Sequence, residues 1–97
     1  MAAPIVVSAL VHSLAEDFIV YPIINKMRMG SIYPEEKEKT QFLEYACAII
    51  KDAGMPMTLI LVALVYIDRV DPRKVPQFSE AFYTLFSGAL MFAGEVR

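Results

Sequence analysis

The chain has 97 residues, of which 57% are hydrophobic and 21% charged, and its formal net charge is −2. This length corresponds to one domain, and the high apolar content excludes a disordered chain. Binding to a nucleic acid needs a positive face for the phosphates, and the densest charged run, residues 35–39, is mixed in sign. A nucleic acid is therefore not an expected partner.

A single cysteine, Cys47, excludes a disulfide bond within the chain. Because small secreted domains usually carry several cysteines, we expect a reducing compartment, the cytoplasm or the nucleus. The apolar run between Pro56 and Asp68 is too short for a bilayer, which takes about 20 residues, so no membrane association is expected. The apolar N-terminal residues lack a basic start and do not predict a signal peptide.

The first predicted helix covers residues 4–28. Its apolar side chains recur at spacings of four and three, which is one face of a helix, and they are Val7, Val11, Leu14, Phe18 and Tyr21. Pro22 cannot donate a backbone hydrogen bond, so this helix is expected to kink or stop near it. Gly30 and Ser31 predict a loop.

Three more helices are predicted after this loop. The second begins at Pro34, since proline suits the first helical position, and Gly54 is its predicted C-cap. The third covers residues 56–69, and because it has no polar face we expect it to be buried on all sides. The fourth covers residues 76–93, with an apolar face made by Phe78, Phe82, Leu85, Ala89 and Phe92.

The predicted fold is an all-α four-helix bundle. Residues 4–97 form one domain, in which the N-terminal helix of residues 4–28 precedes the three helices of residues 34–97. No segment alternates with a period of two clearly enough to predict a strand. Gly88 falls inside the fourth helix, where glycine costs about 1 kcal/mol relative to alanine. We expect it to permit a close approach between helices.

Residues for catalysis are few. The only histidine, His12, is followed by Ser13, but adjacent side chains on a helix point in different directions. One cysteine and one histidine far apart match no metal-ligand spacing, and no glycine-rich phosphate loop is present. We therefore expect no catalytic residue, no metal and no cofactor. A small enzyme with a pocket near His12, Asp17 or Cys47 is the least favoured alternative.

The most specific pattern is the apolar helix of residues 56–70, which ends in Tyr66, Ile67, Asp68 and Arg69. It resembles the second helix of a cyclin box, and the likeness is greatest to fungal cyclins of the phosphate-regulating type. Residues 39–53 and 85–93 resemble the first and third helices of the box, so that the resemblance covers about residues 35–95. It implies the first half of a cyclin box and a regulatory protein that binds a cyclin-dependent protein kinase through helix packing.

The resemblance also implies roles for particular residues. In the family, an aspartate at the position of Asp68 pairs with a basic residue near the start of the preceding helix, and Lys39 has that position here. We therefore expect a Lys39–Asp68 ion pair between two helices, with Tyr66 and Arg69 in structural roles. The residues expected to contact a partner lie after the first helix and at the end of the last, and they are Lys26, Arg28, Phe92 and Glu95.

Two departures from the family keep an alternative open. A cyclin box has five helices, and the resemblance ends with the third. The family's third helix ends near a lysine that contacts the kinase, and this position is Glu95 here, which reverses the charge. The alternative is a truncated cyclin-like helical module for interaction or dimerisation, without kinase binding. Apolar surface left by the missing helices would then be covered by a homo-oligomer or another partner.

Overall fold

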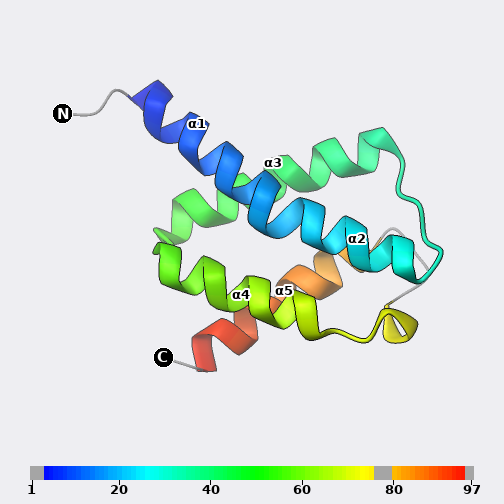
Figure 1. Cartoon of the computed structure of the whole chain (residues 1–97). Coiled ribbons are helices and arrows are strands. Elements are labelled where there is room, and N and C mark those ends of the chain that lie inside the picture. Colours follow the sequence, from blue (N-terminus) through cyan, green and yellow to red (C-terminus); the bar gives the residue numbers. More distant parts are fainter. Residues whose placement is uncertain (1–3, 76–79, 96–97) are drawn as a thin grey trace.

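The computed structural model describes residues 4–75 and 80–95, with side chains described for residues 10–75 and 80–94. In these ranges every regular element is helical, which confirms the predicted all-α bundle (Figure 1). The last two helices pack most closely on each other, whereas the helix before them packs mainly on the first helix.

The first helix runs without a break from Pro4 to Met29, but it changes geometry on the way. Between α1 (Pro4–Ala15) and α2 (Tyr21–Met29), residues Glu16–Val20 form a π-helical turn, in which the N–H of Tyr21 donates to the carbonyl of Glu16. Pro22 lies in the first turn of α2. The wider preceding turn accommodates the proline ring, which would otherwise clash with the carbonyl four residues earlier. The helix therefore continues past Pro22.

The π turn also changes which side chains face the core. The predicted apolar face ran through Tyr21, but this side chain is 52% exposed. Ile19 and Ile23 are fully buried instead. A π turn holds more residues than an α turn, so positions after it are rotated relative to a regular helix. The prediction that Tyr21 belongs to the core face is wrong for this reason.

The second predicted helix is α3 (Glu36–Ala53), which begins two residues later than Pro34. Glu35 is the N-cap in an extended conformation, and its backbone N–H donates to the Glu38 carboxylate at 3.3 Å, as in a capping box. Proline thus precedes the cap. At the other end, Gly54 has a φ of 59°, which confirms it as the predicted C-cap in the left-handed region.

The third helix, α4 (Met57–Arg69), confirms the predicted element but not its burial. Its core face is buried, whereas Met57, Leu61 and Val65 on the opposite side are 40–43% exposed. The molecule measures 45 × 32 × 16 Å along its principal axes. Since packed helices lie about 8–10 Å apart, the thin dimension holds only two layers of helices. An apolar helix in two layers keeps one side open, so the prediction of burial on all sides is wrong.

The last helix, α5 (Ala81–Glu95), lies beside α4 (Figure 1). A 3₁₀ turn, Pro72–Lys74, follows α4. The predicted start of the last helix at Pro76, and Phe78 on its face, lie outside the described residues. A Cβ atom on Gly88 would lie 2.5 Å from the hydroxyl of Tyr66 in α4. The absence of a side chain at Gly88 therefore permits a close approach between helices, as predicted.

The core is centred on the π turn and α2. The largest fully buried side chains come from the π turn and the four helices that follow, and they are Ile19, Ile23, Met27, Phe42, Ile60, Ile67, Phe82 and Phe86. Every buried residue of the described chain is apolar, and no buried polar side-chain atom there is left without a hydrogen bond. The core is therefore made by apolar packing, which leaves chemistry to the surface.

Candidate functional site

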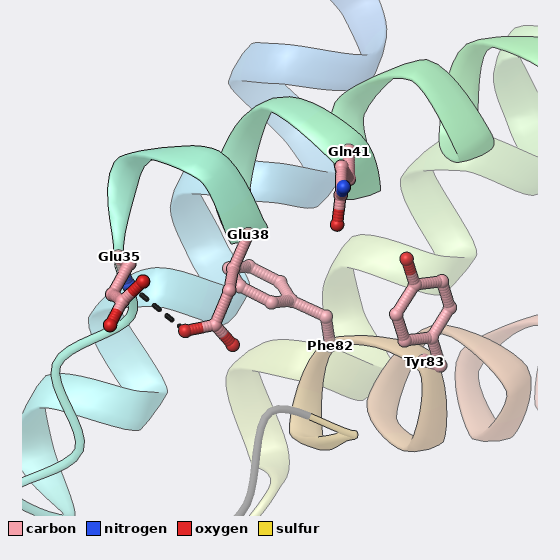
Figure 2. Close-up of a pocket in the computed structure, with 5 residues that line it drawn as sticks. All are labelled: Glu35, Glu38, Gln41, Phe82 and Tyr83. Carbon is pink, nitrogen blue, oxygen red and sulfur yellow. Dashed lines mark hydrogen bonds between the residues drawn. The ribbon is translucent and has the colours of Figure 1, made fainter.

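A pocket of about 260 Å³ opens between the start of α3 and the start of α5. Its lining comes from both helices and consists of Glu35, Glu38, Gln41, Phe82 and Tyr83. Figure 2 shows Glu38 and Gln41 extending from α3 toward α5, and the ring of Tyr83 rising from α5 toward α3. Carboxylates and an aromatic ring thus border the same space.

Aromatic rings form the wall of this pocket. Phe42 stacks on Phe82 with ring centroids 4.7 Å apart, and Tyr45 meets Tyr83 edge to face at 5.0 Å. Both tyrosines are about 40% exposed. Carboxylates beside an exposed aromatic face are complementary to a cation, such as a guanidinium or ammonium group of a partner. The sequence alone did not predict this pocket, although the aromatic residues at positions 42, 45, 82 and 83 were a visible signal.

The predicted Lys39–Asp68 ion pair is wrong. The ammonium of Lys39 instead donates to the carboxylate of Glu36, one turn earlier in α3. Lys39 borders a pocket with Tyr21 and Ile24 of α2, whereas Asp68 borders one with Pro22, Asn25 and Lys26 on another side of the same helix. Helix α2 therefore lies between the two charges and keeps them apart.

The residues expected to contact a partner do not form one surface. Lys26 is half-buried and Arg28 exposed near the end of α2, while Phe92 is half-buried near the end of α5. These two helix ends lie on opposite sides of the molecule (Figure 1). Glu95 is the last residue of α5, and its side chain lies outside the described ones. Partner binding through these four residues stays a prediction.

Tyr66, Asp68 and Arg69, for which the sequence predicts structural roles, lie at the C-terminal end of α4. Tyr66 is half-buried, and its ring packs against Phe92 with centroids 5.6 Å apart. Asp68 and Arg69 are exposed. Tyr66 joins α4 to α5 through contacts with both Gly88 and Phe92.

His12 and Cys47 border the same cleft between α1 and α3, which has a volume of about 420 Å³. Asp17 is exposed and does not line this cleft. Burial raises the pKa of the Cys47 thiol, and the nearby Glu16 and Glu44 raise it further against the opposing effect of Lys51. A protonated thiol is a poor nucleophile at neutral pH. The surroundings of Cys47 therefore do not activate its thiol as a nucleophile.

Alkylation of Cys47 tests this conclusion. We expect iodoacetamide to modify the folded chain at pH 7.5 at least about three times more slowly than the urea-unfolded chain. In the folded chain the thiolate is less populated, and the side chain of Cys47 is half-buried. Because the thiol pKa is higher in the folded state, the protonated thiol adds to the free energy of unfolding at neutral pH. This contribution is lost as the pH rises above the ordinary range of thiol pKa values and through the raised pKa of the folded state. Mass spectrometry measures the rates, with glutathione as the control thiol. Equal rates in the two states would contradict the raised pKa.

Among the described residues, no three side chains of histidine, cysteine, aspartate or glutamate gather closely enough to hold a metal ion. None of the helices in the described ranges combines the length and the apolar character needed to cross a membrane. Comparisons of the chain with protein-family models, with curated proteins and with solved structures found no match.

Proposed function

We propose that this chain is a regulatory protein-binding module that docks its partner on the uncharged surface of α4 and α5. Residues 57–67 of α4 and residues 81–94 of α5 include no charged side chain. Apart from Tyr83, which lines the pocket between α3 and α5, the exposed large apolar side chains of these two helices are Met57, Leu61, Val65 and Met91, and these four define the uncharged surface. This surface is the observation that carries the proposal.

The composition of this surface favours docking of a protein partner. Single exposed apolar residues are normal on a monomer, but a larger apolar area usually marks a site of protein interaction. Here the molecule is only two helical layers thick, so the adjacent helices α4 and α5 each keep an open side. Both open sides carry exposed apolar residues. A partner that packs on α4 and α5 would add a third layer and remove these side chains from water, at roughly 25 cal/mol for each Å² of apolar area.

The expected partner is a cyclin-dependent protein kinase, from the cyclin resemblance of residues 35–95. In this proposal the chain performs no chemistry of its own. It acts by packing against the kinase and binding one arrangement of its mobile catalytic elements more tightly than the others, which shifts the population of the kinase toward that arrangement. Loss of apolar contact at Leu61 or Met91 would weaken the complex and reduce the shift in the population of kinase arrangements.

Co-purification with a cyclin-dependent kinase of the phosphate-regulating type tests this function. We expect the wild-type chain to form a one-to-one complex, and Leu61→Asp and Met91→Asp each to weaken it at least about tenfold, because a carboxylate would be buried in an apolar interface. Leu10→Asp is the matched control, since Leu10 is 60% exposed on α1, away from the uncharged surface. If all three variants are folded by circular dichroism and lose the same affinity for the kinase, docking on this surface is contradicted.

The alternative, a helical interaction module without kinase binding, is supported by the missing Lys39–Asp68 pair and by the separation of Lys26 from Phe92. It predicts no complex with the kinase. It also predicts that the chain alone runs as a dimer in size-exclusion chromatography with light scattering, and that Leu61→Asp returns it to a monomer while Leu10→Asp does not. A wild-type chain that is monomeric and binds the kinase would exclude this alternative.

A further inference from the structure

A second cleft, separate from the uncharged surface, lies where the end of α4 meets the 3₁₀ turn and α5. Its volume is about 400 Å³. Three segments contribute to its lining, which consists of Tyr66, Arg69, Val70, Asp71, Lys74, Thr84 and Leu85. It combines an apolar floor with a polar rim, as binding clefts in proteins commonly do.

The floor and the rim differ in exposure. Leu85 is buried, and Tyr66 and Val70 are half-buried, so these three side chains form the floor. Arg69 and Lys74 are exposed at the rim. An apolar side chain of a partner could therefore be covered by the floor while a polar neighbour of that side chain reaches the rim.

The charges at the rim are not balanced. The Asp71 carboxylate accepts hydrogen bonds from the backbone N–H of Arg73 at 2.9 Å and from the guanidinium of the same residue at 3.1 and 3.2 Å. These hydrogen bonds lower the pKa of Asp71, the charges of Arg73 and of the nearby Lys74 lower it further, and Asp71 stays ionised as the hydrogen-bonded partner of Arg73. Within the described part of the chain, neither Arg69 nor Lys74 makes an ion pair. The cleft thus has two unpaired cations in a chain whose net charge is −2.

We propose that this cleft binds a segment of a partner protein in which an apolar side chain is flanked by carboxylates. Charge complementarity selects an acidic ligand, because the only carboxylate of the lining is already paired. The open rim selects a protein segment, because a shallow cleft does not enclose most of the surface of a small molecule. The apolar side chain packs on Tyr66, Val70 and Leu85, and the carboxylates meet Arg69 and Lys74.

Amide chemical-shift titration of the full chain with short peptides tests this assignment. The probe is acetyl-Asp-Leu-Glu-amide, and the matched controls are acetyl-Asn-Leu-Gln-amide, which lacks the charges, and acetyl-Asp-Ser-Glu-amide, which lacks the apolar side chain. We expect the probe to bind with a dissociation constant of about 1 mM, with shifts confined to residues near Val70 and Leu85, and each control to bind at least about threefold more weakly. Equal binding by the probe and both controls would overturn the proposal.

A double variant separates charge recognition from a general effect of net charge. Arg69→Gln with Lys74→Gln should weaken the probe about three- to tenfold and remove its salt dependence. Lys37→Gln with Lys51→Gln removes the same two charges at exposed positions outside the cleft and should leave the affinity unchanged. If both double variants weaken binding of the probe equally, the assignment of this site is overturned. The probe contains no kinase sequence, so this result is independent of kinase binding.

Discussion

Replacing Phe42 with alanine is expected to lower the free energy of unfolding by about 3–5 kcal/mol, the range found when a buried aromatic side chain is removed. Phe42 is fully buried in α3 and contacts three aromatic rings of α5: it stacks on Phe82, and it meets Tyr83 and Phe86 edge to face at 5.4 and 5.6 Å. The backbones of α3 and α5 do not pair closely. Their contact therefore depends on the length of these side chains.

This dependence makes the effect of truncation large. When a short side chain replaces the ring, neither helix can move inward without breaking its own packing against the first helix. Urea denaturation followed by circular dichroism measures the loss. Phe42→Leu is the matched control and should cost less than half as much, because leucine keeps most of the buried volume. If both variants lose less than about 1 kcal/mol, the ring cluster does not join α3 to α5.

Replacing Gly88 with alanine is the second substitution with a large expected effect, and its sign depends on Tyr66. Alanine favours the helix over glycine by about 1 kcal/mol, but its Cβ would lie 2.5 Å from the Tyr66 hydroxyl oxygen and 3.0 Å from the ring carbon that carries it. Overpacking of this kind usually costs about 1–3 kcal/mol. We therefore expect Gly88→Ala to destabilise the chain by about 1–2 kcal/mol, since the steric cost exceeds the gain in helix propensity.

A double-mutant cycle checks this balance. In a Tyr66→Leu background the hydroxyl and the ring are gone, so Gly88→Ala should stabilise the chain by about 0.5–1 kcal/mol through helix propensity alone. Chemical denaturation of the four chains gives the coupling energy. The same effect of Gly88→Ala in both backgrounds would show that Tyr66 does not set the requirement for glycine.

Local signals in the sequence predicted the elements well. Gly54 ends α3 as predicted, because glycine is suited to the positive φ of a C-cap. The apolar α4 was also predicted as a helix. The exposed side of α4 was not predicted. Whether a helix is buried on every side depends on how many layers surround it, and the spacing of residues does not contain that information.

The candidate sites were much less predictable. The Lys39–Asp68 pair was inferred from a family resemblance, and in the structure α2 separates the two residues. The pocket between α3 and α5 and the cleft between α4 and α5 combine residues that are far apart in the sequence. Glu35 and Tyr83 are 48 positions apart, and Arg69 and Leu85 are 16 positions apart. Tertiary packing decides which helices are in contact and at which end. A single sequence identifies the side chains but not these helix–helix contacts.

The π turn corrects the phase of the first helix, because it holds one residue more than an α turn. An α-helix turns by about 100° for each residue, so a regular α-helix of the same sequence would rotate α2 by that angle relative to α1. Ile23 and Met27, which are now buried, would then turn away from the core. Deletion of one residue from Glu16–Val20, such as the exposed Asp17, would instead restore regular α geometry and leave both side chains facing the core.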